Sequence, residues 1–230
     1  MTADALKSEL ADRYSLAEAT YKVAGFSLQI TSVADSYTLL DRISPEEFVK
    51  DEQMPYWAEI WPSSFVLSNY LAHEIGVEGK RGIELGAGVG VVGIALRKAG
   101  ASMCVTDYAV EALDFMKVNA LQNGVALDER FEVFELDWRN IRLEEKFDFV
   151  CAADVLYERR NLLPILLAIE KLLKPNGTAY IADPRRQIAS GFVALAKDNQ
   201  FSIDVISCPI DFNRKTLEVD IYALQKSLCA

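Results

Sequence analysis

Five acidic side chains stand at the ends of short apolar segments that are spaced along the chain. They are Glu84, Asp107, Asp137, Asp154 and Asp183. A carboxylate accepts hydrogen bonds from hydroxyl and amino groups and pairs with cations. Open α/β sheets bind ligands at the carboxyl ends of their strands, and turn formation does not readily explain five such acids. The acids therefore predict one ligand site at one end of a sheet.

A glycine loop follows the first of these segments. Gly86, Gly88 and Gly90 alternate directly after Leu85. Glycine allows a positive φ and lets a ligand lie against the main chain. The apolar residues from position 91 onward suit a helix packed on a sheet, and the first N–H groups of such a helix have no partner within it. Together these features predict a nucleotide-type cofactor.

The letters of this loop fit two cofactors. Read from Gly88, they spell Gly-x-Gly-x-x-Gly, the dinucleotide fingerprint. Read from Gly86, they spell Glu-x-Gly-x-Gly-x-Gly, which resembles the first motif of the class I, S-adenosylmethionine-dependent methyltransferases. A dinucleotide loop needs its first glycine directly after the strand, and counted from Gly86 its third glycine would be Val91. The loop favours S-adenosylmethionine, with Glu84 available for a cationic ligand group, and NAD is the alternative.

Two further acids suit other parts of such a cofactor. Asp107 lies 21 residues after Gly86, a spacing at which an acid reaches the hydroxyl pair of a ribose. Asp137 offers an acceptor for an adenine amino group, and Trp138 beside it offers an aromatic face. A nicotinamide site does not require that pairing, so it again favours S-adenosylmethionine.

Composition limits the class of protein. The chain has 230 residues and a formal net charge of −10, which disfavours nucleic-acid binding and suits capture of a basic protein, although acidity also serves solubility. Its four cysteines lie far apart and His73 is its only histidine, so we expect no metal site and a reducing cytoplasm. No apolar run reaches transmembrane length and the first residues hold no signal-peptide core, so we expect no membrane partner.

The elements before the glycine loop form an N-terminal extension over residues 1–53, predicted to be a lid or a substrate-side addition. Helical spacing covers residues 3–19, a strand or hairpin is expected over residues 21–33, and a capping box at Ser44–Glu47 predicts a short helix. An aromatic loop over residues 54–64 follows, and Ser63 or Ser64 is expected to cap a helix over residues 65–75.

The rest of the chain alternates strands and helices. Because this rhythm is typical of a mostly parallel sheet with helices on both faces, we expect an α/β fold whose last two strands form a hairpin. Strands are predicted at 82–85, 101–106, 131–136, 147–153, 178–182, 201–207 and 217–225, and helices at 110–121, 161–173 and 188–197, with a turn at 175–177.

An ordered set of motifs strengthens the resemblance. The chain is similar to methyltransferase family 16, the seven-β-strand protein-lysine methyltransferases, in five motifs that occur in the same order. These are residues 61–71, the loop from Glu84 to Gly90, Thr106-Asp107, residues 136–138 and the run from Ala153 to Tyr157. The resemblance spans roughly residues 54–225 and defines a methyltransferase domain over residues 54–230. The run from Pro55 to Ala58 particularly resembles the branch that contains the lysine methyltransferase of the electron-transfer flavoprotein beta subunit.

The resemblance implies a Rossmann-like seven-stranded sheet with an antiparallel last strand. It also implies S-adenosylmethionine as cofactor and S-adenosylhomocysteine as product. It places Asp154 and Tyr157 at the acceptor, where Asp154 would guide a lysine ammonium and hold the amine. Together with the loop and the strand-end acids, it predicts a cofactor site made of Trp61, Glu84, Gly86, Ala87, Gly88, Gly90, Asp107, Tyr108, Asp137, Trp138 and Ala153.

Alternative functions follow from other features. The acceptor is expected to be an accessible lysine of a protein, with a small-molecule amine as the alternative. Nucleic-acid and glutamine methyltransferases carry Asn/Asp-Pro-Pro-Tyr after the fourth strand, and here Val155 and Leu156 replace the prolines. An NAD-dependent oxidoreductase would use the Tyr222-x-x-x-Lys226 spelling, which needs a helix but falls in a predicted strand. A binding module without activity is the remaining alternative.

Overall fold

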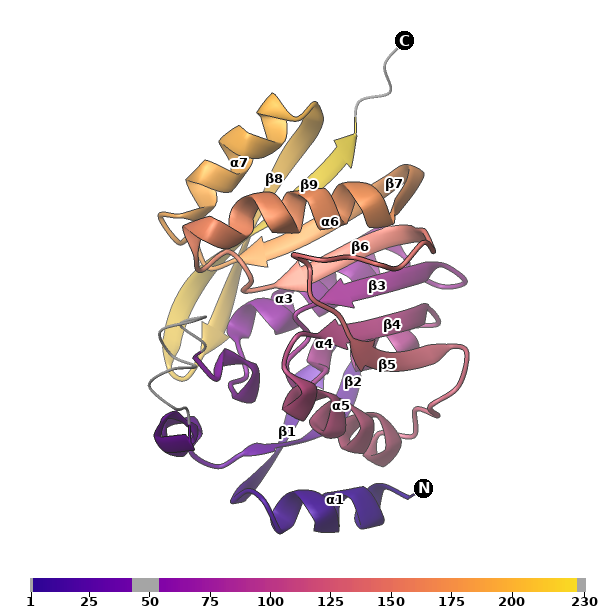
Figure 1. The fold of residues 1–230 in the computed structure, drawn as a ribbon, viewed down its shortest axis with the longest axis vertical. Helices are drawn as coiled ribbons and strands as arrows, with labels where there is room; N and C mark the ends of the chain where they lie inside the picture. The colour runs from indigo at the N-terminus through magenta and orange to yellow at the C-terminus, as the bar shows by residue number, and fades with distance from the viewer. Residues whose placement is uncertain (1, 43–53, 227–230) are drawn as a thin grey trace.

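The computed structural model describes residues 2–42 and 54–226. The predicted capping box at Ser44–Glu47 lies outside these residues. A seven-stranded sheet, with strand order β5-β4-β3-β6-β7-β9-β8, runs through the molecule (Figure 1). The strands are β3 (Arg81–Leu85), β4 (Ser102–Asp107), β5 (Phe131–Glu135), β6 (Phe147–Ala153), β7 (Leu173–Asp183), β8 (Phe201–Phe212) and β9 (Lys215–Lys226).

The pairing of the strands confirms the predicted topology. Neighbouring strands in the series β5-β4-β3-β6-β7 pair in parallel, and β9 is antiparallel to both of its neighbours, β7 and β8. The chain between the two last strands turns at Asn213 and Arg214, whose φ angles are +49° and +63°. Such a two-residue turn lets pairing continue to its edge, so β8 and β9 extend beyond the predicted limits.

Alternate residues of β6 supply two separate apolar cores. Phe149 and Cys151 belong to the core that includes α3 (Pro62–Tyr70), α4 (Val91–Lys98) and α5 (Val110–Gln122). Val150 and Ala152 belong to the core that includes α6 (Leu162–Leu172) and α7 (Ala189–Asp198). Because both faces of the sheet are covered, its central strands are mostly apolar, which explains why the sequence showed them as short apolar segments.

The N-terminal residues form a helix and a hairpin rather than one long helix. α1 spans Ala3–Ala11, and β1 (Leu16–Val23) pairs with β2 (Phe26–Val33) in a separate two-stranded sheet. The predicted helical spacing over residues 3–19 is therefore wrong beyond Ala11, because Leu16 and its successors pair with β2 instead. The strand or hairpin expected over residues 21–33 is a hairpin that begins earlier, at Leu16, with positive φ at Ala24 and Gly25 in its turn.

Two other local predictions need correction. α3 begins at Pro62 with Trp61 as its N-cap, so neither predicted serine caps it; proline is suited to the first helical position. The turn at residues 175–177 lies within β7, where the pairing with β6 is interrupted and Asn176 has a φ of +65°. Short helical turns complete the fold at Ser36–Arg42, Tyr56–Ala58 and Arg159–Asn161, and a π-helical turn at Leu71–Ile75 extends α3.

Asn119 on α5 joins the N-terminal hairpin to the glycine loop. This side chain is fully buried. Its Nδ2 donates to the carbonyl groups of Val89 (2.9 Å) and Thr31 (3.0 Å), and its Oδ1 accepts from the Thr31 N–H (2.8 Å). The hairpin is thus bonded through one residue to the loop that follows β3.

Replacing Asn119 with alanine is expected to lower the free energy of unfolding by about 1–2 kcal/mol, because buried backbone groups of Val89 and Thr31 lose their partners. Urea denaturation measures this change. Asn123→Ala is the control, since Asn123 makes similar bonds to Gln29 at the surface, where water can replace them. Equal losses in the two variants would contradict the role assigned to Asn119.

Candidate active site

A cavity of about 550 Å³ opens at the carboxyl ends of the central strands. The residues predicted for the cofactor and acceptor sites line it except Gly90, and of the five strand-end acids Asp183 does not line it. Gly90 instead caps α4 with a φ of +87°, and a Cβ atom there would meet Met116 of α5 at 3.3 Å. Gly90 is thus placed where the loop turns into the helix, and its contact with the cofactor stays a prediction. Tyr14 and Leu39 of the N-terminal extension also line the cavity.

The glycine loop needs glycine both for its turn and for its close contacts. Gly86 and Gly88 have φ angles of +66° and +56°. A Cβ atom on Gly86 would lie 3.1 Å from the Trp138 ring, and one on Gly88 would lie 2.9 Å from the carbonyl oxygen of Trp57. β3 ends at Leu85, directly before Gly86, which is the register of the methyltransferase motif rather than that of the dinucleotide fingerprint.

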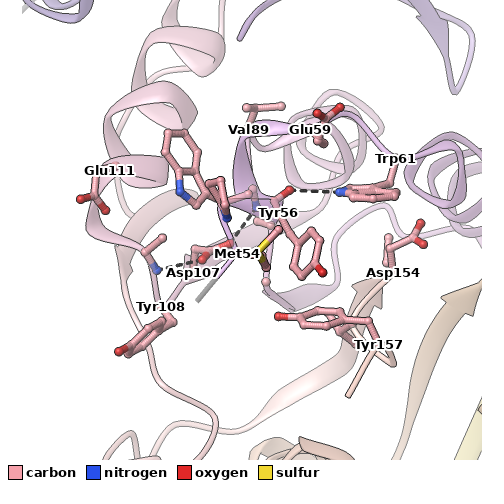
Figure 2. A pocket seen from close by; sticks show the side chains of 18 of the residues that line it. Met54, Tyr56, Glu59, Trp61, Val89, Asp107, Tyr108, Glu111, Asp154 and Tyr157 are labelled. Atoms are coloured by element: carbon pink, nitrogen blue, oxygen red, sulfur yellow. Dashed lines mark hydrogen bonds between the residues drawn. The ribbon is translucent and has the colours of Figure 1, made fainter. Parts of the chain in front are cut away.

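Asp107 lies below this loop at the end of β4. Its Oδ2 accepts from the Gly88 N–H and its Oδ1 from the Ala109 N–H, each at 2.9 Å. Burial raises the pKa of this carboxyl group, and the backbone hydrogen bonds act in the opposite direction. Asp107 therefore holds the loop and presents a carboxylate to the same cavity (Figure 2).

Glu84 is buried at the start of α4. Its Oε2 accepts from the Gly93 N–H at 2.7 Å, so it caps the helix, and it also borders the cavity. A Cβ atom on Gly93 would meet Val105 at 2.3 Å, which shows how closely α4 packs on β4. Burial raises the pKa of Glu84 to about 8.

The free energy of unfolding is expected to fall as pH rises from about 5 to 8 because of Glu84. Over that range the folded state keeps a proton that the unfolded state, with a pKa near 4.5, has released. Glu84→Gln keeps an acceptor for Gly93 and removes the titration, so its stability should decline less over the same range. Urea denaturation at several pH values measures both proteins, and parallel declines would show that Glu84 does not titrate there.

The adenine side of the predicted site contains an arginine that sequence reasoning missed. Arg139 donates to Asp137 through Nε (2.9 Å) and through its backbone N–H (2.8 Å), and its guanidinium lies 4.8 Å from the centre of the Tyr108 ring. Asp137 thus already has a cationic partner. Trp138, packed beside Gly86, remains the aromatic face of this end of the cavity.

The other end of the cavity holds Asp154 among aromatic rings (Figure 2). The Tyr56 and Tyr157 rings meet edge to face with centres 4.9 Å apart, and Trp61 donates from Nε1 to the Tyr56 carbonyl at 3.0 Å. Asp154 follows β6 in a left-handed conformation, with φ at +62°, and donates its N–H to Ala182. The predicted acceptor pair, Asp154 and Tyr157, therefore lies in the same cavity as the glycine loop.

Arg186 pairs with Asp154 and was not predicted. Its Nη2 lies 2.6 Å from Asp154 Oδ1. Burial raises the pKa of Asp154, whereas Arg186 and the facing Ser63 at the start of α3 lower it. Asp183, the fifth strand-end acid of the sequence, is fully buried, and it accepts from Arg186 rather than lining the cavity. In the sequence, the spacing of three residues between Asp183 and Arg186 was the one signal for the contacts among Asp154, Arg186 and Asp183.

The cavity fits S-adenosylmethionine by three observations. The glycine loop passes so close to Trp57 and Trp138 that a side chain at Gly86 or Gly88 would collide with them, so only glycine leaves the backbone of the loop open to a ligand. Buried carboxyl groups of Glu84 and Asp107 offer acceptor oxygens for an ammonium and for ribose hydroxyl groups. The aromatic walls suit adenine at one end and an alkyl chain at the other.

The part of the chain that the structure describes has neither a metal-binding cluster nor a membrane-spanning helix. Within 2–42 and 54–226, no group of three or more histidine, cysteine and acidic side chains is arranged to hold a metal ion. No helix in those ranges is long and apolar enough to cross a membrane.

Known proteins resemble this chain in sequence and fold. Residues 48–199 match the family described as lysine methyltransferase. The chain is 32% identical over 183 residues to protein N-lysine methyltransferase METTL21A of Mus musculus, covering 76% of this chain and 79% of that protein. It is 32% identical over 132 residues to EEF1A lysine methyltransferase 3 of Mus musculus, covering 56% of each.

A solved structure agrees at the level of the fold. Magnesium protoporphyrin IX methyltransferase from Synechocystis PCC 6803, with bound SAM, matches with a TM-score of 0.59 and 18% sequence identity. The match covers 85% of this chain and 99% of the other. The sheet that carries the cavity is therefore of the Rossmann-like methyltransferase type.

Proposed function

The chain belongs to the lysine methyltransferase family, and from that premise we propose that it transfers a methyl group from S-adenosylmethionine to a lysine side chain of another protein. The observation that best supports a lysine acceptor is the position of Asp154. This buried carboxylate lies with aromatic rings in the same cavity as the glycine loop. A carboxylate with aromatic walls suits a cation on an alkyl chain.

The residues of the cavity divide into two groups by what they would hold. Asp107 would accept from the ribose hydroxyl groups, Trp138 would stack on the adenine, and Glu84 would face the ammonium of the cofactor. Gly86 and Gly88 would let the backbone approach it closely. When bound, S-adenosylmethionine supplies an electrophilic methyl group on a sulfonium, which a neutral amine takes by displacement.

Asp154 and Tyr157 would prepare the acceptor for that displacement. A lysine is an ammonium in water and has no lone pair until it loses a proton. Asp154 would pair with the ammonium on arrival, and would accept a hydrogen bond from the neutral amine after its proton has passed to water. Tyr56 and Tyr157 would hold the alkyl stem. Positioning of this kind supplies roughly 7–11 kcal/mol when the reacting atoms are well aligned.

The acceptor must reach a covered carboxylate. Neighbouring atoms cover both oxygens of Asp154 in this structure. Tyr56, 38% exposed and in contact with Tyr157, is the ring that we expect to move when a lysine enters. An aromatic wall that closes on the alkyl stem would also exclude water from the reacting centre.

The rim of the cavity favours a protein over a small amine. Its lining includes the exposed side chains of Tyr108 and Val110 and the exposed acids Glu59, Glu111 and Glu135. The exposed arginines of the lining, Arg139 and Arg160, are each paired with an acid, Asp137 and Glu158. Exposed apolar and acidic groups around one opening suit a basic segment that carries the lysine, and the net charge of −10 would attract it.

The family assignment argues against the alternative function, an NAD-dependent oxidoreductase. Tyr222 and Lys226 both lie on β9, where the extended backbone separates residues at this spacing. They therefore do not form the paired tyrosine and lysine of a reductase helix.

Transfer of a labelled methyl group tests the proposal. The protein is incubated with methyl-labelled S-adenosylmethionine and a cell lysate, and the lysate is then separated into proteins and small molecules. Label in the protein fraction is expected. Label confined to small molecules would assign a small-amine acceptor and contradict the proposal. Binding of S-adenosylmethionine without transfer to any fraction would indicate a binding module.

A further inference from the structure

Arg186 joins two buried carboxylates next to the acceptor end of the cavity. Its Nη2 lies 2.6 Å from Asp154 Oδ1, and its Nη1 donates to Asp183 Oδ2 at 3.0 Å. Its backbone N–H donates to Asp183 Oδ1 at 2.6 Å. The guanidinium also lies over the Trp61 ring, 5.7 Å from its centre. Arg186 is therefore held from several sides in one position.

The arginine reaches Asp154 from outside the cavity. Asp154 lines the cavity, whereas the described residues Arg186 and Asp183 do not. The Asp154 and Asp183 side chains are 3% and 0% exposed, and that of Arg186 is 24% exposed. Arg186 is thus placed to control the direction of Asp154 without occupying the space of a ligand.

Asp154 depends on this contact for its ionised form. Neither of its oxygens accepts a hydrogen bond of regular geometry from the described residues, although Ser63 faces the carboxyl group. The charged groups that face it are Arg186 and Asp183, the second of which repels it. A buried carboxylate that lacks a counterion is costly, so without Arg186 Asp154 would lose the cation that favours its ionised form, and Ser63 would remain to orient it.

We propose that Arg186 is a positioning residue, which holds Asp154 through Oδ1 and balances Asp183, and so leaves Asp154 Oδ2 for the acceptor amine. This inference rests on the proposed function, because it requires an amine acceptor at Asp154. Arg186 does not line the cavity, so the proposal gives it no contact with the acceptor or the cofactor.

Substitutions at two adjacent arginines test the role. Arg186→Met is expected to lower kcat/KM for the acceptor by about 10- to 100-fold, as small misplacements of a positioned group do. The Kd for S-adenosylmethionine should stay within about twofold, and Arg186→Lys should restore part of the activity. Arg185→Met is the matched control, because Arg185 is paired with Asp220 on β9 and is 46% exposed. It should behave like the unchanged protein.

A double-mutant cycle separates this role from a general structural one. If Arg186 acts only through Asp154, then Arg186→Met should change the rate by less than about twofold in an Asp154→Asn background. An equal loss in both backgrounds would overturn the proposal. Full activity in Arg186→Met would also overturn it.

A readout that needs no acceptor keeps the inference separate from the proposed function. The carboxyl carbon of Asp154, labelled with ¹³C and followed by NMR in the cofactor-free protein, should titrate at higher pH in Arg186→Met than in the unchanged protein. An unchanged titration would show that Arg186 does not control Asp154. If the unchanged protein methylates no lysine, the proposed function fails, and this titration still decides whether Arg186 sets the state of Asp154.

Discussion

Replacing Asp154 with asparagine is expected to reduce methyl transfer by about 10²-fold or more, a loss of ~2.7 kcal/mol in transition-state stabilisation. Asparagine keeps the shape of the side chain and tolerates the left-handed backbone, where φ is +62°. It removes the charge that would draw in a lysine ammonium and orient the amine. Cofactor affinity should be nearly unchanged, because Asp154 lies at the other end of the cavity from Asp107 (Figure 2).

Single-turnover transfer with saturating cofactor measures this effect. Tyr157→Phe is the control, and it should do less harm because it keeps the aromatic wall and loses only a hydroxyl group. If Asp154 served only to form the turn after β6, asparagine would replace it well. Full activity in Asp154→Asn would therefore remove Asp154 from the acceptor site.

Asp107→Ala is expected to weaken S-adenosylmethionine binding by ~1.5–3 kcal/mol, the value of a lost charged hydrogen bond. This corresponds to about a 10- to 150-fold increase in Kd. The substitution removes the acceptor for the ribose hydroxyl groups, and it also frees the Gly88 N–H that Asp107 holds at 2.9 Å. Asp107→Asn, which keeps an acceptor for the loop, should lose less.

Calorimetric titration with S-adenosylmethionine compares these variants. Asp137→Ala is the control in the same cavity, since Asp137 is already paired with Arg139 and its loss should cost less. Unchanged affinity in Asp107→Ala would contradict the assignment of the ribose site. If Asp137→Ala lost as much affinity for S-adenosylmethionine as Asp107→Ala, the claim that Asp107 contributes more to cofactor binding than Asp137 would be contradicted.

The parts of this site that lie next to a strand could be predicted from the sequence. β6 was predicted with its observed limits, Phe147–Ala153, because a central strand covered on both faces is a continuous apolar run. The glycine register followed from the end of β3 at Leu85, and Asp107 and Asp154 followed from the ends of β4 and β6. In each case a local pattern and the topology of the sheet determine the position.

The contacts that join distant segments could not be predicted in the same way. The pairing of Arg186 with Asp154 depends on the conformation of the loop after β7, where Arg185 has a φ of +60°, and no local pattern encodes that conformation. The bond from Asn119 to Val89 likewise depends on the packing of α5. The helical spacing over residues 3–19 misled because strand pairing with β2 outweighed local periodicity beyond Ala11.

The central claim is that the acceptor atom is the side-chain nitrogen of a protein lysine. The most direct measurement is mass spectrometry of lysate proteins incubated with the enzyme and isotopically labelled S-adenosylmethionine. The account predicts heavy methyl groups on lysine Nζ that depend on the enzyme and are lost with Asp154→Asn. Heavy methyl groups on another side chain, or lysine methylation that persists in Asp154→Asn, would contradict it.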